Sequence, residues 1–257
     1  MKRAFPLTKA NRIRLARAYR DVPRVDLSLD CVVEGQMGKA FVDDLQDPRV
    51  FKVEVGPFFY LAGEACGRPA RLMLGNLTPG TLLMPSAAGW LDAAQAMYGE
   101  RLMPFPRYSF SFATVTDENL SGICATSPFA GAVKSMDHAF ANRVWDKDHF
   151  VDLSDFDSPR DFVQRGVGFY LETAGEIIGA AYSSLVCSRG IEVSVFVLDE
   201  YRRRGIATVL AACLLRWCLA HDMEGHYDAA NPISCILAER LGYTRRGGYL
   251  AYYLQTG

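Results

Sequence analysis

Three apolar segments joined by short turns occupy much of the last third of the chain. They run over residues 168–172, 177–187 and 191–198, and the turns between them contain Gly175 and Gly190. Strand-length segments separated by three or four turn residues are typical of neighbouring antiparallel strands. This part of the chain therefore predicts an antiparallel meander.

A basic turn and an apolar helix follow the third strand. The turn has the sequence DEYRRRG and ends at Gly205, and a helix is expected over residues 206–220. The helix is apolar nearly all round, apart from Thr208 and Arg216, so it should be buried against the sheet. The remaining elements predicted in this part are a strand at 225–229, a helix at 234–241 and a strand at 249–254.

The start of the helix after the basic turn is a predicted anion site. Its first backbone N–H groups have no partner within the helix, and the helix dipole adds partial positive charge there. Gly205 permits close approach to the backbone, and the arginines at 202–204 add positive potential. A pyrophosphate matches this description. The hexapeptide alone would also match a solvated basic turn, and the elements around it favour the anion site.

At this point the sequence resembles a known family. The segment IEVSVFVLDEYRRRGIATVLAACLL resembles the strand–turn–helix core of the GCN5-related N-acetyltransferases (GNAT), and NPISCILAERLGY resembles their second conserved element. Together the two cover Ile191 to Leu254, and a weaker match extends back to about Ser135. In detail the chain is most similar to bacterial two-part members whose N-terminal half is not typical of the superfamily.

The resemblance implies a fold and a cosubstrate. The implied fold is α+β, with a mixed, mostly antiparallel central sheet flanked by helices. The implied reaction moves an acetyl group from acetyl-CoA to a primary amine by direct attack, without a metal. The residues expected to bind the pantetheine arm and the pyrophosphate are Val195, Phe196, Val197, Arg203, Arg204, Gly205, Ile206, Ala207, Thr208 and Asn231.

Three residues are candidates for the chemistry. The amine must lose a proton to attack, and Glu192, on the strand before the turn, is the first candidate acceptor; an exposed strand carboxylate is its alternative role. Ser234 is expected near the thiol. The tyrosine that protonates the thiolate in many members corresponds here to Ala238, so the usual acid is absent. Tyr252, on the last strand, is a candidate acid or pocket wall.

The rest of the chain is less legible. We predict an N-terminal α+β domain over residues 1–125 and a GNAT-like domain over residues 126–257. The first domain could form part of the acceptor site, mediate dimerisation, or be a diverged copy of the same fold. Its predicted elements are a helix within the first 20 residues, strands at 22–30, 50–55, 58–62 and 108–113, a helix at 90–98, and a break at 103–107 caused by two prolines.

Composition excludes several classes of protein. The net charge of −1 disfavours a nucleic-acid binder, and no apolar run is long enough to predict a membrane span. Seven cysteines without a CxxC pair indicate reduced thiols and a cytoplasmic protein. A zinc site formed by Cys213, Cys218, His221 and His226 is disfavoured, because Cys213 and Cys218 lie five residues apart on a helix and do not share a face. Two alternative functions are left open: a catalytically degenerate CoA-binding or regulatory module, and a binder of nucleic acid through local basic clusters. Assembly into a homodimer is also left open.

Overall fold

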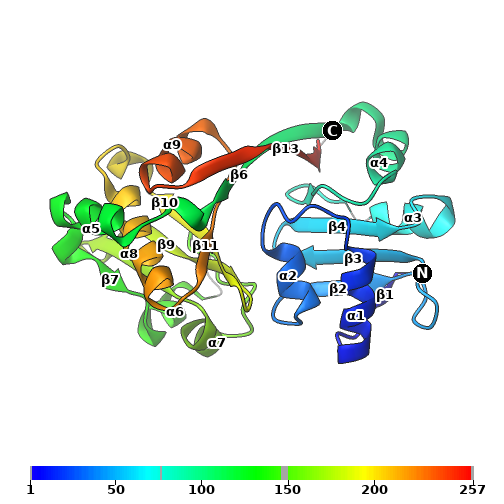
Figure 1. Ribbon diagram of the computed structural model, residues 1–257, viewed down its shortest axis with the longest axis horizontal. Helices are drawn as coiled ribbons and strands as arrows, with labels where there is room; N and C mark the ends of the chain where they lie inside the picture. Colours follow the sequence, from blue (N-terminus) through cyan, green and yellow to red (C-terminus); the bar gives the residue numbers. More distant parts are fainter. Residues whose placement is uncertain (1, 76, 146–149, 256–257) are drawn as a thin grey trace. The chain divides into compact units, whose positions relative to one another are not determined.

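The computed structural model describes residues 2–75, 77–145 and 150–255. The chain folds into two compact units, Met1–Arg107 with Gly248–Gly257, and Tyr108–Gly247. Figure 1 labels the elements of both. Mostly antiparallel sheets flanked by helices confirm the predicted α+β class. No helix in these described ranges has the length and apolar character needed to cross a membrane.

The first unit is built on a mostly antiparallel sheet covered by helices. A salient feature of its core is Trp90, which is fully buried among apolar side chains that include Phe59 and Leu61. Its elements are β1 (Arg3–Ala4), α1 (Lys9–Ala18), α2 (Ser28–Val33), β2 (Lys39–Val42), β3 (Val50–Val55), β4 (Phe58–Gly63), α3 (Gly67–Leu74), β5 (Leu82–Leu83), α4 (Trp90–Tyr98), and parts of β6 (Leu102–Ser111) and β13 (Thr244–Leu254). The sheet order is β1-β2-β3-β4-β5-β13-β6-β12.

Two expectations for this region were wrong. The strand predicted at 22–30 is absent, and α2 begins at Ser28 instead. Asp26 accounts for the difference, because its buried carboxylate accepts hydrogen bonds from the Ser28 N–H and the Tyr60 hydroxyl, both at 2.8 Å. A carboxylate that bonds the backbone two residues ahead favours a turn over an extended strand.

The two prolines at 104 and 106 do not break structure either, because β6 runs from Leu102 through both to Ser111. Residues two apart in a strand direct their N–H groups to the same edge. The strand β12 (Asp228–Ala229) pairs with β6 only at Ser109 and Tyr108. Pro104 and Pro106 therefore lie in a stretch of β6 that does not pair with β12, and a residue without an N–H donor is tolerated along an unpaired edge.

The second unit contains the predicted meander. Strands β8 (Gly168–Thr173), β9 (Glu176–Val186) and β10 (Gly190–Val197) pair antiparallel in sequence order, which confirms the prediction. The other elements of this sheet are β7 (Lys134–Ser135) and β11 (Glu224–His226). The helices of the unit are α5 (Asp117–Thr126), α6 (His138–Val144), α7 (Pro159–Arg165), α8 (Ile206–Ala220) and α9 (Pro232–Arg240).

Helix α8 is the centre of this unit. It packs against β8, β9 and β10 and against α5, and Leu210, Leu214 and Leu215 are fully buried. The sheet approaches the helix closely at Gly179 of β9, where an added Cβ would lie 2.8 Å from Ile206 Cγ2. The predicted apolar helix over 206–220 is thus confirmed in its bounds and in its burial.

The division predicted near residue 125 falls inside α5, which belongs to the second unit. As a division of the chain by role it stays a prediction. The strand predicted at 225–229 is two short strands, β11 and β12, which join different sheets. The candidate site lies where the chain passes from β11 in one sheet to β12 in the other.

Candidate functional site

Strands β10 and β11 run side by side for three residues and then part. Their parallel pairing joins Gly190, Ile191 and Glu192 of β10 to Glu224, Gly225 and His226, where β11 ends. Strand β10 continues to Val197, paired with β9 on its other edge. The chain after His226 turns instead to β12 and the other sheet. We call this point, bounded by Glu192 and His226, the fork.

The side chains of the two residues at the fork, Glu192 and His226, are hydrogen-bonded to each other. Glu192 Oε2 lies 3.0 Å from His226 Nδ1, and both side chains are buried. A β-bulge adjoins this pair, since the register of β9 skips Ser184 between the partners of Glu192 and Val193. The Ser184 hydroxyl donates to the Glu192 carbonyl oxygen at 3.3 Å. Glu192 is therefore a buried, hydrogen-bonded carboxylate and not the exposed strand residue that was its alternative.

The face of β10 that carries Glu192 also carries Ser194 and Phe196, as alternation predicts. Ser194 lies opposite Tyr182 of β9 and is hydrogen-bonded to its hydroxyl. Burial raises the pKa of Tyr182, and the Asp152 N–H donates to the same hydroxyl at 3.0 Å. Phe196 stacks on Phe150, with ring centroids 4.9 Å apart. The helix α8 packs on the opposite face, where Val197 lies across from Gly179.

The turn before α8 has two residues in the left-handed region, Arg203 with φ 62° and Gly205 with φ 87°. A side chain in that region costs about 1–2 kcal/mol, so its presence at an arginine marks a locally strained turn. Arg202 Nε donates to the Val197 carbonyl oxygen at 3.2 Å, and Arg204 Nη2 donates to the Glu200 carbonyl oxygen at 3.0 Å. The first bond connects the turn to the last residue of β10, and the second lies within the turn.

The beginning of α8 has the features of an anion site. Gly205 is its N-cap and supplies no side-chain oxygen, and the first helical turn consists of Ile206, Ala207 and Thr208. A Cβ built on Gly205 would meet no atom within 4 Å, so the space beside Gly205 is open, and the first N–H groups of a helix have no partner within it. This is the turn at which the sequence predicts a pyrophosphate site, and Arg203 and Arg204 immediately precede Gly205 in it.

Asn231 and Ser234 lie in the first turn of α9. Asn231 is the N-cap, and its Oδ1 accepts the Ser234 N–H at 2.9 Å. The half-buried Ser234 hydroxyl lies 2.9 Å from the hydroxyl of Tyr227, which is buried. Burial raises the pKa of Tyr227 to about 12. Ala238, at the position of the usual tyrosine, is fully buried one turn further along.

Tyr252 is the predicted residue that lies elsewhere. It belongs to the first unit, pairs with Leu83 of β5 and packs against the apolar core around Trp90. The other predicted site residues belong to the second unit. Within that unit Glu192 lies at the fork, and Ser234 is bonded to Tyr227, the residue that follows the fork.

The sequence interpretation missed the roles of two consecutive residues. His226 was considered only as a zinc ligand, and Tyr227 was not considered. Glu192 and His226 come together because β10 and β11 pair in parallel, and α8 connects these two strands along the chain. The register of such a pair cannot be read from a local sequence pattern.

Over the described residues no group of three or more potential ligands is placed to hold a metal ion.

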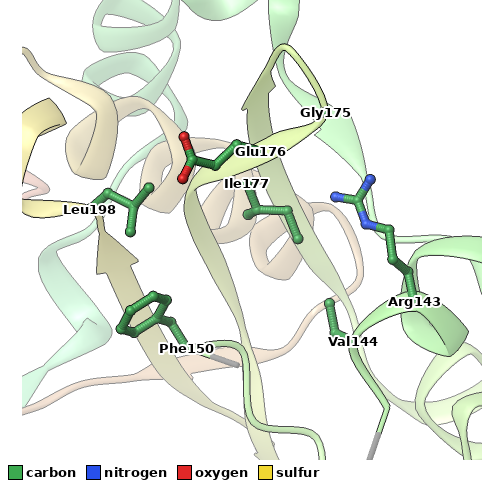
Figure 2. Close-up of a pocket in the computed structure, with 7 residues that line it drawn as sticks. All are labelled: Arg143, Val144, Phe150, Gly175, Glu176, Ile177 and Leu198. Carbon is green, nitrogen blue, oxygen red and sulfur yellow. The ribbon is translucent and has the colours of Figure 1, made fainter. Parts of the chain in front are cut away.

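Figure 2 shows a cavity of about 270 Å³ near the end of β10. Phe150 and Leu198 stand on one side of it and Arg143 on the other. The remaining lining residues are Val144, Gly175, Glu176 and Ile177. None of the predicted site residues lines this cavity. The predicted cofactor site is instead a strand edge and an exposed turn, while the cavity lies on the side where Phe150 stacks on Phe196.

Comparison with known proteins assigns the family. The model of the GNAT acetyltransferase family matches residues 25–252, which span both units. The chain belongs to the GNAT acetyltransferase family. A GCN5-related N-acetyltransferase-like protein from Streptococcus suis is 27% identical and superposes with a TM-score of 0.83 over 95% of this chain and 98% of its own.

Two further similar proteins are more distant. An uncharacterized N-acetyltransferase from Bacillus subtilis, YdfB, is 25% identical over 100 residues, and the match spans 38% of this chain and only 38% of that protein. A GNAT-family acetyltransferase from Colwellia psychrerythraea is 10% identical with a TM-score of 0.51 over the full length of both chains, a likeness of fold alone.

Proposed function

We propose that this GNAT protein is an N-acetyltransferase that moves the acetyl group of acetyl-CoA to a primary amine by direct attack. The observation that carries the proposal is the fork. A buried carboxylate lies where β10 loses its parallel neighbour, and the same strand leads directly into an open helix start. One ligand could then lie along β10 with its thioester near Glu192 and its pyrophosphate at Gly205.

The length of β10 is consistent with that placement. Leu198, which follows the end of β10, is six positions after Glu192, and an extended chain rises about 3.3 Å per residue, so this stretch spans about 20 Å. An extended pantetheine arm is of this order. We propose that backbone groups of Val195, Phe196 and Val197 bind this arm, and that Asn231 contacts it from α9. The N–H groups from Arg203 to Thr208 then bind the diphosphate.

Glu192 is proposed to accept the proton of the amine. A lysine-like amine has a pKa of about 10.4 and is mostly protonated at neutral pH, so a proton acceptor is needed before attack. The amine nitrogen bonds to the carbonyl carbon, and the displaced proton passes to the Glu192 carboxylate, directly or through water. His226 Nδ1, 3.0 Å from that carboxylate, fixes its orientation. A backbone N–H of β10 near Phe196 is the proposed donor to the oxyanion.

The acceptor approaches from the face that carries Phe196 and Phe150, opposite α8. That face combines an aromatic stack with polar groups at Ser194 and Tyr182. We also propose a cytoplasmic location, because all seven cysteines are free thiols.

Two assays test the proposal. Calorimetry measures association of CoA with the purified protein, and a thiol reagent measures CoA release from acetyl-CoA in the presence of a panel of primary amines. Gly205→Glu should weaken CoA binding about tenfold or more, because a carboxylate would occupy the place of a phosphate at the helix start. Gly80→Glu is the matched control, since Gly80 has a similar φ of 85° and equally open surroundings.

The alternative is a CoA-binding module that no longer transfers acetyl groups. The buried Ala238 at the usual tyrosine position favours it. Binding of CoA without thiol release for any amine would support this module, and absence of CoA binding would overturn both readings of the site.

A further inference from the structure

The reaction needs a group that stabilises the departing sulfur, and the position at which many relatives carry a tyrosine is Ala238 here. The structure offers a different hydroxyl in the same helix. Ser234 lies one turn before Ala238, is half-buried, and its hydroxyl lies 2.9 Å from that of Tyr227. The two hydroxyls form what we call the Tyr227–Ser234 pair.

The pair is connected to the fork through the chain, because Tyr227 directly follows His226. His226 and Tyr227 are consecutive, yet His226 bonds Glu192 of β10 and Tyr227 bonds Ser234 of α9. Consecutive side chains of an extended chain point to opposite sides, which explains the two partners. A thioester at the fork would thus have a proton acceptor on one side and a hydroxyl pair on the other.

Both members of the pair are held in place. The Ser234 N–H is bonded to Asn231 Oδ1, which fixes the first turn of α9. The Tyr227 ring packs edge-on against Phe110, with centroids 6.2 Å apart, and against Tyr243 at 5.4 Å. A hydroxyl fixed in this way loses little entropy when it acts, which is the advantage of a preorganised donor.

We propose that the Ser234 hydroxyl donates a hydrogen bond to the thioester sulfur as the carbon–sulfur bond breaks, and that Tyr227 positions it by donating its own proton to Ser234 Oγ. The proposal rests on the proposed acetyl transfer. The amine nitrogen forms the new bond to the acetyl carbon, and its proton goes to Glu192. The electron pair of the breaking bond goes to sulfur, which leaves as a thiolate and later takes a proton from water.

The pair donates hydrogen bonds and keeps its protons. An unperturbed thiol has a pKa of about 8.5, whereas burial raises the pKa of Tyr227 to about 12. Moving the tyrosine proton to the thiolate would therefore be unfavourable, and Tyr227 stays a donor throughout the neutral range. A hydrogen bond to a developing charge changes a rate by about ten- to a hundredfold.

Three variants test the pair in the purified full-length protein, with acetyl-CoA and an accepted amine. Ser234→Ala should lower kcat about ten- to a hundredfold with unchanged KM for acetyl-CoA, because the bond forms only as charge develops. Tyr227→Phe should lower kcat less. The double variant should match Ser234→Ala alone, since Tyr227 acts only through Ser234. Ser234→Thr, which keeps the hydroxyl, should restore most of kcat.

A control and a chemical probe separate this role from simple packing. Tyr243→Phe removes another buried hydroxyl bond of the same aromatic cluster, from Tyr243 to the Gly225 carbonyl oxygen at 2.6 Å, and should change stability more than kcat. Replacing Tyr227 by a ring-difluorinated tyrosine keeps the shape and strengthens the donor, so kcat should equal or exceed that of the natural protein.

The outcomes separate this proposal from the proposed function. An active natural protein whose Ser234→Ala variant keeps its kcat overturns the Tyr227–Ser234 pair and leaves acetyl transfer standing. A double variant whose loss is the product of the single losses overturns the positioning role of Tyr227. A natural protein that binds acetyl-CoA but releases no thiol with any amine overturns the function and the pair together.

Discussion

Glu192 has a defined place in the fold and a proposed chemical role. It is the last residue of β10 paired with β11, and its buried carboxylate is held by His226. Glu192→Gln keeps the size and a hydrogen-bond acceptor but removes the base. We expect kcat to fall about 10²- to 10⁴-fold while CoA affinity in calorimetry stays the same. Glu118→Gln, at an exposed glutamate of α5, is the control. An unchanged kcat in Glu192→Gln would exclude this base.

A second residue-scale prediction concerns acid stability. The Arg165 side chain, bonded to Asp161 at 2.6 Å within α7, lowers the pKa of that carboxyl. A lowered folded-state pKa stabilises the protein above the unfolded value of about 3.9, and this contribution is lost as pH falls through the folded-state value. Asp161→Asn should therefore lower the melting temperature by about a degree or two at neutral pH. Calorimetric scans should show the difference vanish in strong acid, and a difference that grows in acid would contradict the assignment.

At the scale of elements, the sequence predicted those whose pattern is local. The meander and α8 follow from apolar periodicity and turn residues. The failures needed tertiary information. The helix at Ser28 depends on the bonds of buried Asp26, and the fork depends on which strand the Glu224–His226 segment joins. The strand–turn–helix segment through Gly205 could therefore be predicted from local pattern, whereas the contacts of His226 and Tyr227 could not, and the site roles of all these residues stay predictions.

Replacing two glycines of helices by alanine should change the free energy of unfolding in opposite directions. Gly205 caps α8 with a φ of 87°, whereas Gly122 lies inside α5 with ordinary helical geometry and no atom within 4 Å of an added Cβ. Gly205→Ala should destabilise the protein by about 1 kcal/mol or more, because the left-handed region penalises a Cβ. Gly122→Ala should stabilise it by up to about 1 kcal/mol through helix propensity. Urea unfolding of both variants measures the two shifts, and shifts of the same sign would contradict the backbone argument.

At the scale of the whole molecule, the family model spans both compact units, yet the residues proposed to bind CoA all lie in the second. Tyr252, the predicted residue in the first unit, packs in that unit's core. We therefore expect CoA to stabilise the second unit directly. A ligand that binds only the folded state stabilises it by about 2.7 kcal/mol at a hundred times its dissociation constant.

Hydrogen exchange with and without CoA measures this effect element by element. Amides of β10 and of the first turn of α8 should exchange up to about a hundredfold more slowly with saturating CoA. Amides of β3 and β4, around the buried Tyr60 and Leu61 of the first unit, should change little. The Gly205→Glu variant serves as the control, because it should lose the protection in both elements of the second unit. Equal slowing in β3 and β4 would show instead that the first unit unfolds together with the second or itself holds part of the ligand, and the division of the chain by role would then have to be redrawn.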